Sequence, residues 1–93
     1  MKLKLKARVN RSDARTIRHA LGQLSAEGSV KKAGNEFVVE AAMEGASARE
    51  LNRMFLSALR KVEKKTTLRA EWVSEDGTTE RFFDHDLKKT IKN

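Results

Sequence analysis

The stretch Ser47–Lys65, SARELNRMFLSALRKVEKK, decides the fold because it has the pattern of one long amphipathic helix. Its apolar residues recur at steps of three and four, the spacing that places side chains on one side of an α-helix. These residues are Leu51, Met54, Phe55, Ala58, Leu59 and Val62. Ser47 and Glu50 form the Ser-x-x-Glu capping box that marks a helix start. We therefore predict a helix from Ser47 whose apolar side packs beneath a sheet.

The opposite side of this predicted helix is cationic. At about 100° per residue, four side chains fall in one stripe: Arg49, Arg53, Arg60 and Lys64. Leu56 lies beside them, off the predicted core face. A single exposed leucine is common, and the alternative is that Leu56 anchors a protein–protein interface. The stripe is the first candidate nucleic-acid-binding surface, and Leu56 is the candidate protein interface.

The residues before this helix predict a strand, a helix and then two further strands. Lys2–Val9 alternates perfectly, with four apolar residues on one face and four cations on the other. A helical stripe follows over residues 14–24, and Gly28 occupies the position of a C-cap glycine. Arg11, Arg15 and Arg18 lie on the outer flank of this helix and extend the candidate surface. Gly34-Asn35 predicts a type II′ turn joining two strands, Ser29–Ala33 and Glu36–Met43.

The residues after the long helix predict a second hairpin. Thr67–Ser74 alternates, and Asp76-Gly77 is typical of a two-residue type I′ turn leading into Thr78–Phe83. Such a turn places Phe83 on the same face as Trp72, and Phe82 on the other face. Residues 84–93 are expected to be a polar C-terminal tail, either a short helix or frayed.

These elements predict an α+β fold in a single domain, residues 1–93. Their order is the ferredoxin-like β-α-β-β-α-β two-layer sandwich, with an additional C-terminal β-hairpin strand. Two helices would cover one face of an antiparallel sheet, and the other face would stay open.

The composition indicates an acidic partner. The formal net charge is +7, so nucleic acid is the first candidate and an anionic protein or membrane surface the second. The 13 interspersed acidic residues also fit a merely soluble surface. No cysteine and no long apolar run is present, so we expect a cytoplasmic protein without a membrane partner. The lack of proline and the 35% charged residues resemble archaeal or thermophile composition.

The sequence offers no enzyme site. The chain lacks phosphate-loop, dinucleotide and zinc-protease motifs, and its two histidines, His19 and His85, have no partner cluster. Asp84-His85-Asp86 is too compact to complete a metal shell, because adjacent residues of an extended segment point to alternating sides. We expect no enzyme, no metal, no cofactor and no small-molecule substrate.

Part of the chain resembles a known family. The run G-N-x-F-V-V-E-A and the later F-L-S-A-L-R resemble the small dimerising (CTAG-type) subunit of the KEOPS tRNA-modification complex. Nine residues carry the resemblance: Asp13, Ala14, Ala20, Leu21, Gly34, Asn35, Ser57, Leu59 and Arg60. The resemblance spans roughly residues 3 to 62, but Leu56 and Ala58 replace the Asn and Tyr of the helix motif. It implies a non-catalytic homodimer that docks a tRNA-modifying subunit; convergence on a common αβ plait is the alternative.

These observations leave two alternative functions. The first is a non-catalytic protein that binds RNA or a ribonucleoprotein through phosphate contacts on its basic helix faces. Sequence-specific base reading is disfavoured, because few aromatics are expected on the open sheet face. The second is an assembly subunit, a homodimer or part of a protein complex, with no direct nucleic-acid contact.

Overall fold

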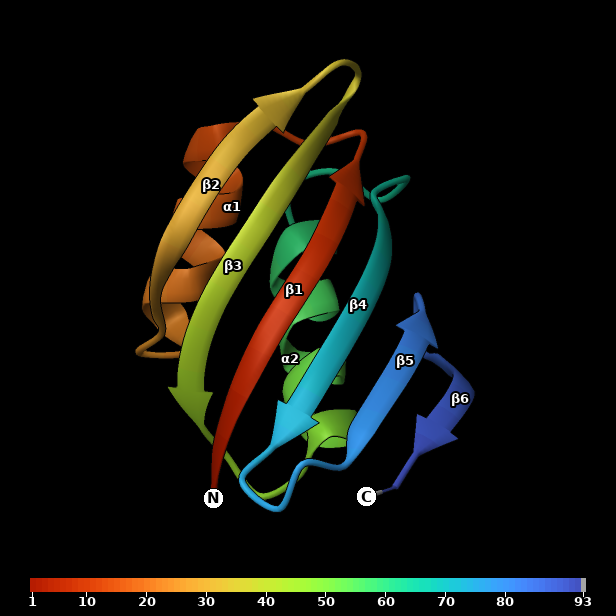
Figure 1. The fold of residues 1–93 in the computed structure, drawn as a ribbon. Helices are drawn as coiled ribbons and strands as arrows, with labels where there is room; N and C mark the ends of the chain where they lie inside the picture. Colours follow the sequence, from red (N-terminus) through yellow and green to blue (C-terminus); the bar gives the residue numbers. More distant parts are fainter. Residues whose placement is uncertain (93) are drawn as a thin grey trace.

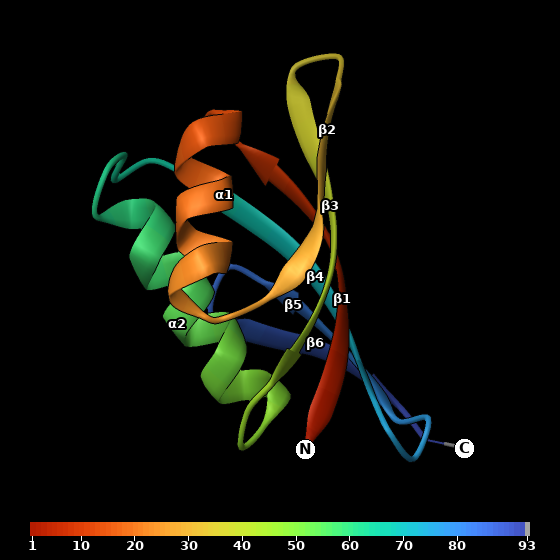
Figure 2. The ribbon, with the colours of Figure 1, turned by 90° about the vertical axis from the view of Figure 1, so that its left-hand side faces the viewer.

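The computed structural model describes residues 1–92 and places two helices against one face of a six-stranded antiparallel sheet (Figure 1). Seen edge-on, the molecule has two layers, and the face of the sheet turned away from the helices is bare (Figure 2). The strand order is β2-β3-β1-β4-β5-β6. The elements are β1 (Lys2–Asn10), α1 (Ala14–Gln23), β2 (Glu27–Ala33), β3 (Glu36–Glu44), α2 (Ala48–Arg60), β4 (Thr67–Ser74), β5 (Thr79–Phe83) and β6 (Asp86–Ile91). The predicted α+β class is confirmed.

Strand β1 is the centre of the sheet, paired with β3 on one side and β4 on the other. Its predicted alternation is confirmed, since its apolar residues are buried and the cations between them are exposed. The buried ones are Leu3, Leu5, Ala7 and Val9. The four cations of this strand therefore project from the open face.

The β2–β3 hairpin has the predicted register. Val30 pairs with Val39 across the ladder, and Gly34 has the positive φ of +64° that the turn requires. Gly28, however, does not cap α1. It lies within β2, where a β-carbon would come within 2.6 Å of the Ala41 β-carbon, so the strands approach too closely for any side chain. The left-handed residue after α1 is Ser25, at φ +53°.

Helix α2 begins as predicted but buries a different face. The Ser47 hydroxyl accepts a hydrogen bond from the Glu50 backbone N–H at 3.1 Å, which confirms the helix start. Met54 and Val62, predicted as core, are 41% and 67% exposed, whereas Leu56 is fully buried. The buried positions are Ala48, Leu51, Asn52, Phe55, Leu56 and Leu59.

The width of the sheet explains why α2 buries a different face from the predicted one. The buried face is centred about 60° away from the predicted one, by the 100° per residue of an α-helix. Arg49, on that flank of α2, lies 6.0 Å from the ring centroid of Phe82 in β5. The sheet thus extends beyond β4 under this side of the helix, and it covers Leu56. The prediction that Leu56 is exposed is wrong.

The β4–β5 hairpin differs from the prediction by one residue. Ser74 receives a backbone hydrogen bond from Gly77 and donates one to Thr78, so the loop contains three residues rather than two. Gly77 has φ +87°, as the last residue of such a loop requires. A one-residue change of register turns every side chain of a strand to the other face. Phe82 is therefore in the core and Phe83 on the open face, the reverse of the prediction.

Residues 86–91 form a strand rather than a polar tail. β6 pairs with β5, and a bulge lies between Arg81 and Phe82. Asn93, the last residue of the predicted tail, lies outside the described residues.

The turn between β5 and β6 is tied to α2 and β4. Asp84, at φ +54°, accepts the Leu68 backbone N–H on its carboxylate at 2.9 Å, and its carbonyl accepts from Asn52 Nδ2 at 2.6 Å. Asn52 Oδ1 in turn accepts from the indole N–H of Trp72 at 3.1 Å. This buried polar link fixes β5, and with it the side chains that β5 presents to the open face.

Candidate nucleic-acid interface on the open sheet face

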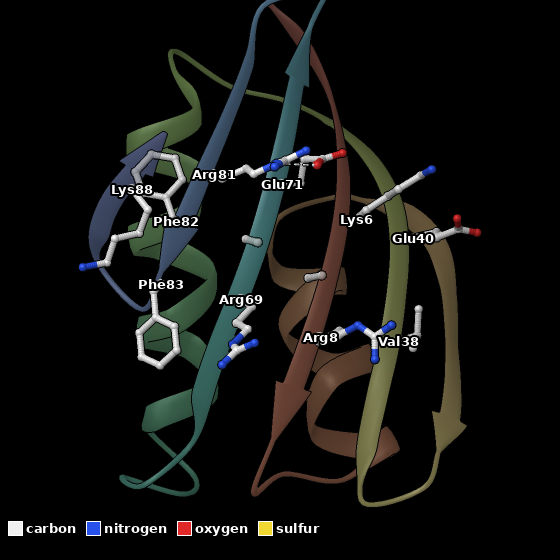
Figure 3. Close-up of a pocket in the computed structure, with 12 residues that line it drawn as sticks. Lys6, Arg8, Val38, Glu40, Arg69, Glu71, Arg81, Phe82, Phe83 and Lys88 are labelled. Carbon is white, nitrogen blue, oxygen red and sulfur yellow. Dashed lines mark hydrogen bonds and ion pairs between the residues drawn. The ribbon is translucent and has the colours of Figure 1, made fainter. Parts of the chain in front are cut away.

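The open face of the sheet forms a shallow hollow of about 720 Å³ across its central strands (Figure 3). Long charged side chains line most of it, and enclosed small-molecule pockets are instead mainly apolar. The lining includes five cations, Lys6, Arg8, Arg69, Arg81 and Lys88, and two acids, Glu40 and Glu71. This composition is suited to an extended anionic ligand that lies across the sheet.

One row of this face is neutralised by its own charges. Lys6 on β1 stands between Glu40 on β3 and Glu71 on β4. Arg81 on β5 completes the row, and its Nε lies 2.9 Å from Glu71 Oε2. Basic and acidic side chains thus alternate across four strands (Figure 3). This row has little positive charge left for a ligand.

The neighbouring row is different. Arg8 on β1 is directly opposite Arg69 on β4, and Phe83 on β5 follows Arg69 (Figure 3). Like charges directly opposite each other on adjacent strands destabilise a sheet. We call these three residues the Arg–Arg–Phe row.

The two arginines of the row are only weakly compensated. Arg8 Nη1 lies 3.7 Å from Glu36 Oε1, at the long end of an ion pair, and its side chain is 60% exposed. The Arg69 guanidinium lies 5.3 Å from the ring centroid of Phe83, and it has no ion pair with any of residues 1–92. Two cations thus face the solvent side by side on the two central strands.

The four cations of the predicted α2 stripe do not form one free surface in the structure. Arg60 Nε donates to the Thr66 carbonyl at 3.0 Å, and its Nη2 lies 3.3 Å from Asp84 Oδ2. Arg53 is 62% exposed and faces Glu50 at 3.9 Å. Lys64 lies in the turn after α2, since the helix ends at Arg60. Arg60 is therefore bound by contacts within the fold, and Lys64 is not on the helix with the other three cations.

The cations near α1 lie on the other side of the molecule from the open face. Arg15 and Arg18 are exposed on the helix. Arg11 precedes it with φ +59°, and its carbonyl accepts the Thr66 hydroxyl at 2.9 Å. These cations and the Arg–Arg–Phe row are separated by the sheet, so they do not form one continuous surface.

The sequence reasoning missed Arg69 and Phe83. The alternation of residues 67–74 placed Arg69 on a polar face, but its position opposite Arg8 depends on how the strands align. The two-residue turn predicted at Asp76-Gly77 puts Phe83 on the wrong face, because the loop contains three residues. No signal within either strand alone reveals the Arg–Arg–Phe row.

Two carboxyl groups have lowered pKa values, one in a helix cap and one in a turn. The Thr16 backbone N–H donates to the Asp13 carboxylate, at 2.8 Å, and lowers the pKa of Asp13. The Thr78 backbone N–H lowers the pKa of Asp76 in the same way. Among residues 1–92, no group of three or more His, Cys, Asp or Glu side chains is placed to hold a metal ion. In this part of the chain neither helix has the length and apolar character needed to cross a membrane.

Comparison with known proteins gives no match to this chain among family models, curated proteins or solved structures.

Proposed function

We propose that this chain is a non-enzymatic cytoplasmic protein that binds RNA through the open face of its sheet. The observation that carries the proposal is the direct opposition of Arg8 and Arg69 on the two central strands. A pairing that destabilises the free sheet becomes favourable when a phosphate group lies between the two guanidinium groups. Departures from local stability rules of this kind are expected at functional sites.

The proposed scaffold is a ferredoxin-like plait extended by two strands. The order β2-β3-β1-β4 and the antiparallel pairing of these strands support this assignment. The helices are confined to one face, so the opposite face is available along its whole width (Figure 2). The proposed surface thus differs from the helix faces that the sequence alone favoured.

Charge reversal tests this proposal. Arg8→Glu combined with Arg69→Glu lowers the formal net charge from +7 to +3, since each change removes two units. The matched control is Arg15→Glu combined with Arg18→Glu, which makes the same change on the exposed side of α1. Binding of a labelled single-stranded RNA of about 20 nucleotides is followed by fluorescence anisotropy across a salt series.

The two double variants are expected to differ strongly. Loss of the one phosphate contact that the two arginines share reduces the log–log salt slope by about 0.7, the value per contact for a single strand. The control keeps the slope of the wild type. If the control loses binding and the sheet-face variant keeps it, the helix faces are the true surface. If the wild type does not bind RNA even at low salt, the proposal fails.

A role as a homodimeric or multiprotein assembly subunit is the second candidate. Its most direct route would be pairing of a sheet edge with another chain. Both edge strands carry two adjacent lysines, Lys31 and Lys32 in β2 and Lys88 and Lys89 in β6. Lysines on an edge strand oppose such pairing. This candidate therefore has less support, and sedimentation velocity at two concentrations tests it: we expect a monomer at both.

A further inference from the structure

Phe83 is the aromatic side chain that the sheet presents to solvent. Its exposure is 38%, and it lies in the Arg–Arg–Phe row. The other four aromatics belong to the core between the sheet and the helices: Phe55, Trp72 and Phe82 are buried, and Phe37 is half-buried against it. An exposed phenylalanine alone is ordinary, so its surroundings decide what it does.

The surroundings of Phe83 are those of a stacking platform. Arg69 lies 5.3 Å from its ring centroid, within the range of a cation–π contact. This contact places a guanidinium group, which binds phosphate, over one face of the ring. Arg8 extends the cationic part by one more strand, so the row spans two strand spacings, roughly 10 Å.

On the basis of the proposed function, we infer that the ligand of this row is a single-stranded segment of RNA. One unpaired base stacks on the face of Phe83 that Arg69 does not cover, and the neighbouring phosphate lies between Arg69 and Arg8. Stacking does not select the base, because every base has a π-face. This agrees with a surface that lacks the aromatic set needed for sequence-specific reading.

The two arginines are the part of the row that binds phosphate. At the Phe83 end β6 contributes charges of both signs, because Asp86 pairs with Phe83 and Lys88 lines the hollow beside it (Figure 3). A duplex cannot use Phe83 in this way, because its bases are already stacked on one another and its surface offers phosphates and hydroxyl groups.

The first test introduces a reporter with Phe83→Trp. Trp72 is the natural tryptophan and is fully buried, so its emission serves as an internal reference in the wild type. Titration with single-stranded RNA should quench the emission of the Phe83→Trp protein to saturation and leave the wild type unchanged. Heparin, a polyanion without bases, should bind without quenching.

The second test removes the ring without changing the charge. Phe83→Leu should weaken binding of the single strand by roughly 5- to 150-fold, the range for loss of one stacked base, with the salt slope unchanged. Phe83→Tyr, which keeps a π-face, should bind within about twofold of the wild type. The wild type should prefer the single strand to a blunt duplex of the same sequence.

The outcomes separate this inference from the proposed function. If Phe83→Leu binds as Phe83→Tyr does, or single strand and duplex bind equally, the stacking site is refuted while binding through Arg8 and Arg69 stands. Quenching by heparin would also refute it. If the wild type binds neither nucleic acid at low salt, the proposed function fails and this inference fails with it. Circular dichroism of each variant confirms that the fold is kept.

Discussion

Replacement of Asn52 by alanine tests how the buried polar link stabilises the fold. Asn52 is 1% exposed on α2, where its Nδ2 donates to the Asp84 carbonyl at 2.6 Å and its Oδ1 accepts from Trp72 Nε1 at 3.1 Å. Alanine leaves both partners without a hydrogen bond. Each unpaired buried group costs about 1–3 kcal/mol, with the part-buried carbonyl at the low end. We expect Asn52→Ala to lose about 2–4 kcal/mol of the free energy of unfolding.

That loss is a large share of the total. A chain of this length typically has a free energy of unfolding of about 5–14 kcal/mol. The assay is urea unfolding followed by far-UV circular dichroism, in which the midpoint should fall while the m-value stays constant. Ser57→Ala is the matched control, because Ser57 is exposed on the same helix and its change should stay within about 0.5 kcal/mol.

A double-mutant cycle with Trp72→Phe isolates the hydrogen bond between the two side chains. Each single change leaves one polar group of the pair buried and unpaired, and the double change leaves neither. The double variant should therefore be more stable than the sum of the single losses predicts, by about 1 kcal/mol or more. Additive losses, or a loss below about 0.5 kcal/mol for Asn52→Ala alone, would refute the reasoning.

Two further predictions concern charged residues. Arg60→Ala should lower the free energy of unfolding by about 1 kcal/mol, because it removes the contact with Asp84 and a backbone hydrogen bond. Arg53→Ala on the same helix should change it by less than about 0.5 kcal/mol, and equal effects would contradict a structural role for Arg60. The pKa of Asp13 is lowered because its carboxylate accepts the Thr16 backbone N–H. The ionised Asp13 side chain therefore stabilises the folded protein above the ordinary carboxyl pKa, and this stabilisation is lost as the pH falls through the lowered pKa. The difference in free energy of unfolding between the wild type and Asp13→Ala should therefore shrink below about pH 4. The difference between Asp13→Asn and Asp13→Ala should not change with pH. If the difference between the wild type and Asp13→Ala also stays constant, the prediction is contradicted.

Much of the fold was predictable because the decisive patterns are local. The alternation of β1 and the Gly34 turn each need only neighbouring residues, and the register of Val30 with Val39 follows from that turn. The capped start of α2 depends on Ser47 and Glu50 alone. These features required no knowledge of what lies across the sheet.

The register of the second hairpin was not predictable in this way. Gly77 suits both a two-residue and a three-residue loop, since each needs a positive φ there. The adjacent pair Phe82 and Phe83 makes the apolar pattern equally good in either register. The choice depends on which phenylalanine fits under α2, a tertiary contact that leaves no signature within the strand. β6 is similarly obscure, because Leu87 is its main contribution to the core.

The comparison of Arg60 with Arg69 shows why net charge alone does not locate a binding surface. Both are arginines, and a stripe in the sequence favoured Arg60. Arg60 is held by Asp84 and a backbone carbonyl, so a ligand would have to displace contacts that fix the β5–β6 turn. Arg69 has only the ring of Phe83 beside it and a second cation, Arg8, opposite. An anion gains contacts at Arg69 without breaking any of the fold's ion pairs, and it relieves a repulsion there. The contacts that a cation already makes decide how readily it can bind a ligand, and for this reason we propose the surface around Arg69 on the sheet rather than one that includes Arg60 on the helix.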